Sequence, residues 1–325
     1  MLKNCFVFLI VVVVVTVYYY VYWWEPEQDT SLGCYTAGGD TLPDILDIKT
    51  PSEKSTYFID TSCTSYTKGK IFITPRQACA VESAAFNNPD FQTFLMYASP
   101  GSIKDDNTLS DRLLKILTNI VNVKVVRLNY AGLLNGNVYT KERIQLLILY
   151  KYGGIYLDLD TVTIRSFNGL ALNFAVAESE THVNNAVIRS SIKGSGHEFI
   201  KMCLKELKEY FRGDFWGYNG PVVVTKILKK MCEVNNIKDI MYKKKCSGFT
   251  VYPPEKFYPI FYENWRLYFE DARKKEKAYV MGNSYAIHVW NKLSKNTVSN
   301  SSGSIYRYAA GKYCPQVYSI AREYF

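Results

Sequence analysis

The stretch Tyr150–Phe167, YKYGGIYLDLDTVTIRSF, decides the fold. It divides into an apolar helix, the helix-stopping pair Gly153 and Gly154, a short apolar strand, and then Asp158 and Asp160. Ligands of open α/β sheets bind where strands end at their carboxyl edge. Two aspartates at that edge therefore predict a binding site.

The spacing of Asp158 and Asp160 points to metal chemistry. Carboxylates two residues apart on an extended chain project in the same direction and repel each other unless a cation lies between them. Mg²⁺ or Mn²⁺, held by such carboxylates and by substrate phosphates, removes that repulsion. The ion would bridge the diphosphate of a nucleotide-sugar and stabilise the leaving nucleoside diphosphate. An ordinary surface loop is the alternative, which the apolar helix and strand before it disfavour.

Around this stretch, helix and strand patterns alternate, which predicts an α/β fold with a mostly parallel sheet flanked by helices. The 325 residues, 48% of them hydrophobic, supply a sizeable core and exclude a disordered chain or a disulfide miniprotein. We expect strands at 56–60, 91–98, 121–128, 155–157 and 285–289, and helices at 77–86, 109–117, 139–152, 198–211 and 221–232.

The N-terminal segment 5–24 contains no charged residue and is long enough, at about 30 Å as a helix, to span a bilayer. Lys3 before it and the aromatic and acidic residues at its other end predict a type II orientation. A cleaved signal peptide is the alternative, but its apolar core is usually shorter. The expected organisation is a cytoplasmic tail (1–4), an anchor (5–24), a stem (25–55) and a lumenal domain (56–325).

Eight cysteines, seven of them after the anchor, fit an oxidising lumen. Their spacing gives no zinc motif. Cys232 with Cys246 is the easiest local pair and Cys63 with Cys79 the next, while an odd number cannot all pair internally.

Asn300 begins a glycosylation sequon. The net charge of +9 is read as solvated basic faces or attraction to acidic membrane, and nucleic-acid binding is not expected of a lumenal protein.

Several separated segments together resemble the α-1,4-glycosyltransferase family. Besides YKYGGIYLDLD, they are ACAVESAA (78–85), FWGYNGP (215–221), YPPEKFYPI (252–260), YAIHVWNK (285–292) and KYCP (312–315). The resemblance implies a GT-A-like fold, a Golgi membrane location and a retaining, Mn²⁺- or Mg²⁺-dependent reaction. It also implies a UDP-sugar donor, galactosyl or N-acetylgalactosaminyl, and a glycolipid or other glycan acceptor.

The resemblance also assigns roles to individual residues. Three of the assignments given below have a simpler structural alternative. For His288 it is a hydrogen-bonded core histidine, and for Trp290 an ordinary core aromatic. For the residues assigned to acceptor binding it is a plain helix-start turn. The implied catalytic and metal residues are Asp158, Asp160 and, for the metal alone, His288; the donor-binding residues are Glu142, Gln145, Gly153, Gly154, Asn184 and Trp290; the acceptor-binding residues are Trp216, Gly220 and Pro221.

Two departures from the family pattern favour an alternative function. The family's Asp and Arg on the helix before the double glycine fall on Glu142 and Gln145, so a cation that would offset diphosphate charge is missing. The segment 128–139 is also short. The alternative is a catalytically impaired paralogue that acts as a membrane-anchored sugar-binding or partner protein. No enzymatic nucleophile stands out, and Glu178 and Asp214 are the further carboxylates to test.

Overall fold

The structure is a computed structural model of the 325-residue chain, and it describes residues 33–36, 42–48, 51–129, 141–212, 214–215, 217–242, 246, 248–299 and 301–325. The chain divides after Cys34, and the fold below is that of the body, Tyr35–Phe325. The predicted tail and anchor lie outside the described residues. Within the described part, no helix is both long and apolar enough to cross a bilayer.

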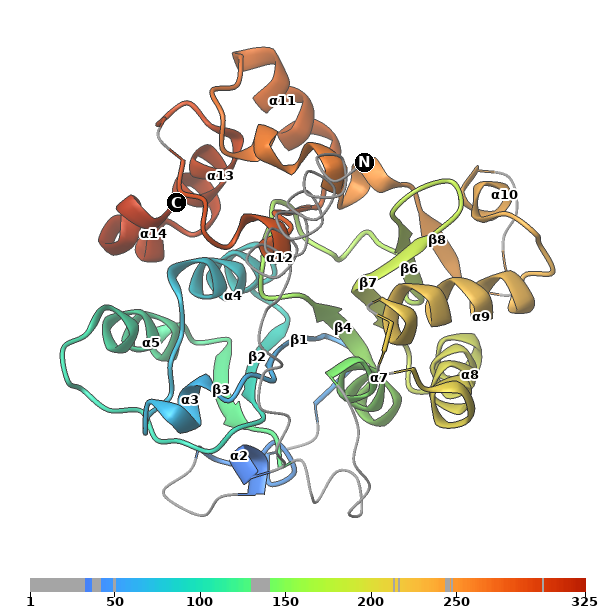
Figure 1. Ribbon diagram of the computed structural model, residues 1–325, viewed down its shortest axis with the longest axis horizontal. Helices are drawn as coiled ribbons and strands as arrows, with labels where there is room; N and C mark the ends of the chain where they lie inside the picture. The colour runs from blue at the N-terminus through green and yellow to red at the C-terminus, as the bar shows by residue number, and fades with distance from the viewer. Residues whose placement is uncertain are drawn as a thin grey trace, which may run out of the picture. The chain divides into compact units, whose positions relative to one another are not determined.

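A mixed sheet forms the centre of the body, and its described strands run in the order β3-β2-β1-β4-β7-β6-β8 (Figure 1). The first four are parallel, β7 is antiparallel to both neighbours, and β6 and β8 are parallel. This confirms the predicted mostly parallel α/β sheet. The strands of this sheet are β1 (Ser55–Asp60), β2 (Gln92–Tyr97), β3 (Val123–Arg127), β4 (Gly154–Leu157), β6 (Phe174–Ala177), β7 (Val183–Ser190) and β8 (Thr250–Tyr252).

A second, two-stranded sheet pairs β5 (Thr161–Thr163) with β9 (Ala286–His288) in antiparallel fashion. Helices pack on both faces of the large sheet (Figure 1). The helices include α2 (Gly33–Thr36), α3 (Thr64–Thr67), α4 (Pro75–Asn87), α5 (Leu109–Asn119), α7 (Lys141–Tyr152), α8 (Gly194–Tyr210), η1 (Tyr218–Val222), α9 (Val223–Met231), α10 (Ile237–Tyr242), η2 (Pro254–Lys256), η3 (Tyr262–Tyr268), α11 (Lys274–Asn283), α12 (Asn291–Ser294), α13 (Ile305–Tyr313), α14 (Pro315–Ala321) and η4 (Arg322–Tyr324).

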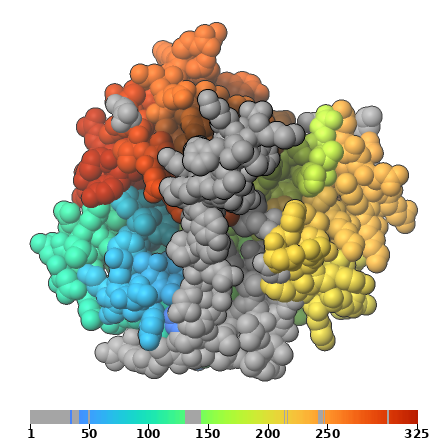
Figure 2. Space-filling model, in the orientation of Figure 1, coloured from blue at the N-terminus to red at the C-terminus, as the bar shows by residue number. Residues whose placement is uncertain are grey.

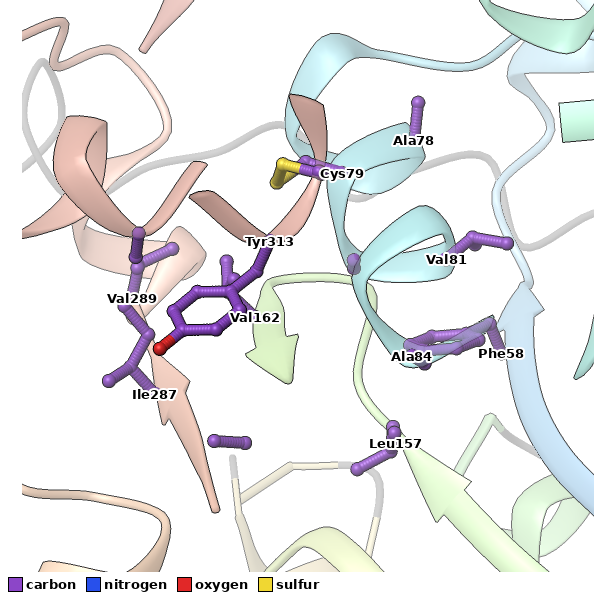
Figure 3. Packing of buried hydrophobic residues seen from close by; sticks show 14 of the residues in the cluster. Phe58, Ala78, Cys79, Val81, Ala84, Leu157, Val162, Ile287, Val289 and Tyr313 are labelled. Atoms are coloured by element: carbon purple, nitrogen blue, oxygen red, sulfur yellow. A yellow bond between two sulfur atoms is a disulfide. The ribbon is translucent and has the colours of Figure 1, made fainter. Parts of the chain in front are cut away.

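The period-2 alternation of each strand divides the core into two layers. In β1, Phe58 faces α4, α5 and the C-terminal helices, whereas Tyr57 and Ile59 face α7, α8 and α9. In β4, Leu157 joins the first layer and Tyr156 the second. Figure 3 shows the first layer, where α4 packs over the sheet. Because both faces are covered, every residue of β1 and β4 is buried, and most of their side chains are apolar, as in a buried parallel sheet.

The double glycine before β4 is required by close packing. Gly153 and Gly154 have φ of 64° and 93°, in the region that disfavours side chains. A Cβ on Gly154 would lie 2.6 Å from the Ser55 carbonyl oxygen, and one on Gly153 would lie 2.9 Å from Ile192. The pair therefore lets α7 turn directly into the strand that carries the aspartates.

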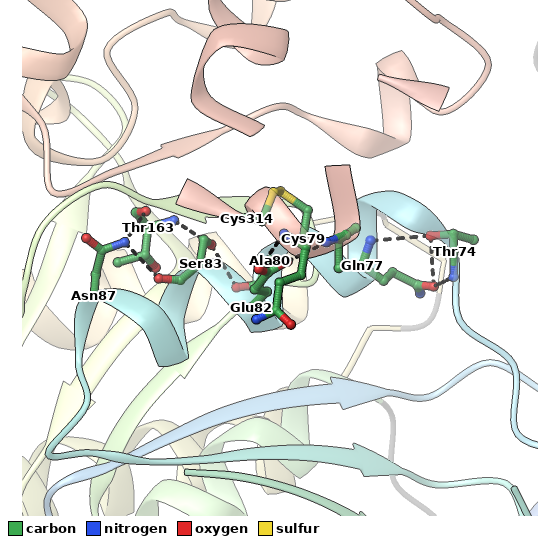
Figure 4. The surroundings of a disulfide bond; sticks show 11 residues. Thr74, Gln77, Cys79, Ala80, Glu82, Ser83, Asn87, Thr163 and Cys314 are labelled. Carbon is green, nitrogen blue, oxygen red and sulfur yellow. Dashed lines mark hydrogen bonds between the residues drawn. A yellow bond between two sulfur atoms is a disulfide. The ribbon is translucent and has the colours of Figure 1, made fainter. Parts of the chain in front are cut away.

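The C-terminal helices are tied to α4 (Figure 4). Cys79 forms a disulfide with Cys314, 235 residues later. The buried Glu82 carboxylate accepts hydrogen bonds from the Gln316 and Val317 amides, at 2.9 and 2.8 Å, at the N-terminus of α14. This satisfies amides that a helix start leaves unpaired. Figure 2 shows the red C-terminal segments against those in blue to teal, as the α14 contacts with α4 and α5 require.

The predicted strands and helices of the first half are confirmed within one or two residues at most ends, but β5, β6, β7 and β8 were not predicted. The predicted helix at 221–232 begins as the π-helix η1 and continues as α9. Inside the predicted stem, Ile45 is buried, and its amide bonds to the Arg127 carbonyl at 2.9 Å. Part of the segment before β1 thus packs on the body.

The cysteine predictions had mixed outcomes. The Cys232–Cys246 pair is confirmed. The Cys63–Cys79 pair is wrong, because α4 directs Cys79 toward the C-terminal helices, where Cys314 lies, and Cys63 is disulfide-bonded elsewhere. Among the described cysteines, Cys203 is free and buried. Sequence proximity favours short loops, but the fold brings a distant cysteine to α4.

The two disulfides should differ in their contribution to stability. Chain-entropy arguments give about 5 kcal/mol for a closed loop as long as that of Cys79–Cys314 and about 3 kcal/mol for one of 14 residues. We predict that the Cys79→Ala/Cys314→Ala double variant loses more free energy of unfolding in urea than Cys232→Ala/Cys246→Ala. Equal losses would contradict the role of the long loop.

Candidate functional site

The site forms where the turn after β4 meets the end of β9. Asp158 and Asp160 lie in the turn between β4 and β5, and β5 pairs with β9 so that Thr161 stands opposite His288. The Val289 amide then donates to the Asp160 carbonyl at 3.1 Å. Val162 of β5 pairs with Ile287 of β9, and Figure 3 shows both residues in the buried core with Val289. Antiparallel pairing thus brings His288 to the aspartates from about 130 residues away.

Three possible metal ligands converge at this junction. His288 Nε2 lies 3.0 Å from Asp160 Oδ1 and 3.9 Å from Asp158 Oδ2. One ligand atom from each of these residues lies within 4.8 Å of the others. The His288 side chain is 7% exposed and that of Asp160 12%, while Asp158, at 25%, is the most open to solvent.

Asp160 is held firmly in place. Its Oδ2 accepts a 2.6 Å hydrogen bond from the backbone amide of Asn291, at the start of α12. Trp290, immediately before, has φ 55° and ψ 55°, a left-handed conformation that is uncommon for a bulky residue. Such strain persists only where the surroundings enforce it, and it is common at functional sites. Here it aims the Asn291 amide at the carboxylate.

Asp158 is oriented by its own strand and by β7. Its amide donates to the Ala186 carbonyl at 2.9 Å, and its carbonyl accepts from the Thr161 hydroxyl at 2.8 Å. The Tyr156 hydroxyl donates to Asp158 Oδ1 at 2.5 Å. The other carboxylate oxygen, Oδ2, is the one that faces His288.

His288 lies in an aromatic cage. Its ring contacts Trp290 edge-on, with centroids 4.3 Å apart, and Tyr258 at 5.7 Å. The indole N–H of Trp290 donates to the Ile260 carbonyl at 2.9 Å. Burial lowers the pKa of His288, but attraction to Asp160, Asp158 and Glu178 outweighs it, so the pKa lies above its ordinary value. Trp290 is thus a buried support for the imidazole, with its own donor already used.

A third carboxylate, Glu178, adjoins the ligand cluster. It follows β6, and its Oε2 accepts a 2.5 Å hydrogen bond from the side-chain nitrogen Nδ2 of Asn184. Asn184 Oδ1 in turn accepts from the backbone amide of Ala186 at 2.8 Å, and the carbonyl of Ala186 is the one that accepts from the Asp158 amide. Glu178 also contributes to the raised pKa of His288 and of the buried Tyr258 hydroxyl, where burial is the largest cause. The β6–β7 hairpin therefore places the Glu178 carboxylate, held by Asn184, beside the possible metal ligands.

The donor set fits a divalent cation. Two carboxylates supply the oxygen ligands that Mg²⁺ and Mn²⁺ prefer, and a neutral imidazole suits the softer Mn²⁺ better than Mg²⁺. The His288 Nδ1 is buried and has no hydrogen-bond partner among the described residues. Nε2, on the other side of the ring, is thus the atom that faces the carboxylates. Asp158, Asp160 and His288 together could hold one ion.

The other predicted residues that the structure describes are not members of this cluster. Gly153 and Gly154 stand at the opposite end of β4, about 13 Å away by strand rise. Gln145 is buried in α7, and its amide nitrogen reaches the Asn185 carbonyl at 3.5 Å. Gly220 and Pro221 lie in η1, where a Cβ on Gly220 would collide with the Asn185 side chain at 2.7 Å. Trp216, Asn300 and the side chain of Glu142 lie outside the described residues.

The structure adds residues that sequence reasoning missed. Tyr156 and Tyr258 are ordinary strand and loop aromatics by pattern, but the Tyr156 hydroxyl donates to Asp158 and the Tyr258 ring contacts His288. Asn291 acts through its backbone amide, for which no sequence signal exists. Asp214, in contrast, is 68% exposed and pairs with Arg212 at 2.6 Å. Of the two further carboxylates, Glu178 is the one the fold brings to the site.

Comparison with known proteins agrees with this geometry. Residues 74–177 match the glycosyltransferase sugar-binding region containing the DXD motif, and residues 192–321 match the α-1,4-glycosyltransferase conserved region. Lactosylceramide 4-α-galactosyltransferase of Rattus norvegicus is 30% identical over 267 residues, covering 76% of this chain and 71% of the relative. α-1,4-N-acetylglucosaminyltransferase of Homo sapiens is 28% identical over 181 residues, covering 55% and 51%.

Among solved structures, the galactosyltransferase LgtC, in complex with donor and acceptor sugar analogues, aligns over 82% of this chain and 95% of its own, with a TM-score of 0.42 and 12% identity. The two family matches contain, between them, the aspartates and His288. By these sequence matches, the chain is a glycosyltransferase and belongs to the α-1,4-glycosyltransferase family.

Proposed function

We propose that this chain is a retaining, metal-dependent α-1,4-glycosyltransferase that transfers a hexosyl group from a UDP-sugar to a glycolipid or other glycan. The observation that carries the proposal is the convergence of Asp158, Asp160 and His288 in a chain of this family. The name of the lactosylceramide 4-α-galactosyltransferase relative favours a galactosyl donor, and an N-acetylgalactosaminyl donor is the alternative. Mn²⁺ is the preferred ion because one of the three ligands is an imidazole.

In the proposed reaction, Asp158, Asp160 and His288 would hold the ion. When bound, the ion supplies the positive charge that stabilises the leaving UDP. The Glu178 carboxylate, fixed by the Asn184 side chain, would accept a hydrogen bond from a hydroxyl of the donor hexose. The acceptor hydroxyl attacks C1 from the face that UDP leaves, the C1–O bond to UDP breaks, and a phosphate oxygen takes the proton. Transfer on one face retains the anomeric configuration.

We further propose that the enzyme is a type II protein of the Golgi membrane, with a tail (1–4), an anchor (5–24), a stem (25–55) and a lumenal catalytic domain (56–325). The charge-free apolar run near the N-terminus supports the anchor. The disulfides support an oxidising compartment. Glycosylation at Asn300 belongs to the same proposal. The roles of Glu142, Gly153, Gly154, Trp216, Gly220 and Pro221 in donor and acceptor binding remain predictions.

A second candidate is a paralogue that binds sugar but does not transfer it. The environment of Gln145 favours it, because the amide contacts the Asn185 carbonyl and offers no positive charge to a diphosphate. The two candidates differ in a measurable way. The enzyme binds UDP in a Mn²⁺-dependent manner and hydrolyses or transfers the UDP-sugar, whereas the paralogue binds glycans without metal-dependent UDP binding.

The sharpest test of the proposed function is Asp160→Asn. The variant keeps the shape of the side chain and an oxygen for the Asn291 amide but removes the charge that the ion requires. We predict that Mn²⁺-dependent UDP-galactose hydrolysis falls at least 100-fold, a loss of about 2.7 kcal/mol of transition-state stabilisation. Equal rates in the variant and in the wild type would remove Asp160 from the reaction.

The metal affinity should depend on pH through His288. Protons and the ion compete for Nε2, and because the pKa is raised above 6.5, competition persists to higher pH than for an ordinary histidine. We predict that the Mn²⁺ affinity, measured by calorimetry, falls by up to about tenfold per unit as pH drops below that pKa. His288→Gln should flatten the slope, and the exposed His182→Gln should leave it intact.

The same histidine gives a stability effect of defined sign in the metal-free protein. A raised folded-state pKa means that the imidazolium stabilises the fold fully below pH 6.5, and that this stabilisation is lost as pH rises through the raised value. Added Mn²⁺ should reverse the trend, because bound metal stabilises the fold at neutral pH. An unchanged pH profile of thermal stability in His288→Gln would contradict this assignment.

Glu178 and Asp214 provide a matched pair of carboxylates. Glu178→Gln should lower the rate of transfer from UDP-galactose by at least about tenfold, because an amide is a weaker acceptor than a carboxylate for a sugar hydroxyl. Asp214→Asn should leave the rate within twofold, since Asp214 is exposed and pairs with Arg212. Steady-state kinetics of both variants is the measurement. A larger loss in Asp214→Asn than in Glu178→Gln would contradict the proposed contact between Glu178 and the donor hexose.

A further inference from the structure

Arg76 is a buried cation outside the proposed metal ligands. It lies in the first turn of α4 and is only 8% exposed. Its guanidinium packs over the rings of Phe269 and Tyr306, 4.9 and 5.5 Å from their centroids. Burying a guanidinium is costly, and burial lowers the pKa of Arg76 while Asp160 counteracts part of that effect. The contacts that the buried guanidinium makes must therefore offset its desolvation cost.

The guanidinium holds the segment that follows His288. Its Nη1 donates to the Ser294 carbonyl at 2.8 Å, to the Ser294 hydroxyl at 3.1 Å and to the Asn291 side-chain oxygen at 3.4 Å. Its Nη2 donates to the Thr297 carbonyl. These partners are neutral oxygens of one short stretch, so the planar fork of Arg76 fixes the course of that stretch.

That stretch in turn holds Asp160. The Ser294 hydroxyl donates to the Val289 carbonyl at 2.7 Å, and the Val289 amide donates to the Asp160 carbonyl at 3.1 Å. The Asn291 amide donates to the Asp160 carboxylate at 2.6 Å. Two routes of hydrogen bonds therefore lead from Arg76 to Asp160, one to its main chain and one to its side chain. Both pass around Trp290, whose left-handed conformation needs external support.

We infer that Arg76 is a positioning residue for the metal site: it holds the 289–297 segment so that Asp160 and His288 keep the geometry that binds the divalent ion. This inference rests on the proposed function of that site. Partners that orient metal ligands from outside usually contribute 10- to 100-fold to metal affinity. Arg76 also offsets part of the negative charge of Asp160, so its loss acts on the ligand through geometry and through charge.

The chain contains a matched control in the same helix. Glu82 is also a buried charged residue of α4, and it also bonds to the main chain of the C-terminal region, at Gln316 and Val317. Its partners begin α14 and take no part in the hydrogen bonds around Asp160. A merely structural role for Arg76 would make the two residues equivalent, whereas a positioning role would separate them.

The experiment is a calorimetric titration with Mn²⁺ in the presence of UDP. Thermal unfolding of each variant is measured in parallel. Arg76→Met should weaken Mn²⁺ binding roughly 10- to 100-fold, and UDP-galactose hydrolysis should recover at saturating Mn²⁺. Arg76→Lys keeps the charge but lacks the fork, so its affinity should lie between those of wild type and Arg76→Met. Glu82→Gln should lower the melting temperature and leave Mn²⁺ affinity unchanged.

Unchanged Mn²⁺ affinity in Arg76→Met, or an equal loss in Glu82→Gln, would overturn the inference. If Arg76→Met does not fold, Arg76→Lys decides: wild-type affinity in that variant overturns the positioning role of the fork. Failure of the proposed function itself gives a different result, because wild-type protein would then show neither Mn²⁺-dependent UDP binding nor hydrolysis.

Discussion

The antiparallel pairing of β5 with β9 is the constraint on which the site depends. Three residues from each strand bring Thr161 opposite His288, and the Val289 amide closes the junction on the Asp160 carbonyl. Without this pairing, Asp158 and Asp160 would lie in an acidic loop at the sheet edge, with no histidine beside them. The C-terminal third contributes a possible metal ligand, His288, a backbone amide for Asp160 and the aromatic rings around the imidazole.

Helix α4 lies between the C-terminal helices and β5 and contacts both. The Cys79–Cys314 disulfide and the Glu82 carboxylate fix α14 to α4, and the Ser83 hydroxyl accepts a 3.0 Å hydrogen bond from the Thr163 amide in β5. One helix therefore contacts both the C-terminal helices and the strand that carries the junction. This explains why ACAVESAA carries resemblance to the family although none of its residues lies among the possible metal ligands.

Sequence predicted the part of the fold that local patterns specify. Apolar strands, the Thr74 helix start and the double glycine gave β1, β2, β3, β4 and α4 close to their observed bounds. β5 is too short, at three residues, to give a periodic signal, and β6 and β7 depend on a hairpin rather than on helix–strand alternation. The aspartates and His288 could be proposed as ligands, but Arg76 and Asn291 act through main-chain contacts that no residue pattern encodes.

The charge balance of the site follows from this arrangement. Asp158, Asp160 and Glu178 place three carboxylates around one buried imidazole, and the raised pKa of His288 is the response of a metal-free site to that negative potential. A proton supplies one positive charge, whereas a divalent ion supplies two and needs the same nitrogen. Under the proposed function, the ion would displace the proton and leave the net charge of the site one unit more positive, which would favour the incoming diphosphate. Because Gln145 offers no positive charge, an ion at this site would contribute more to holding the diphosphate than it would with an arginine at that position.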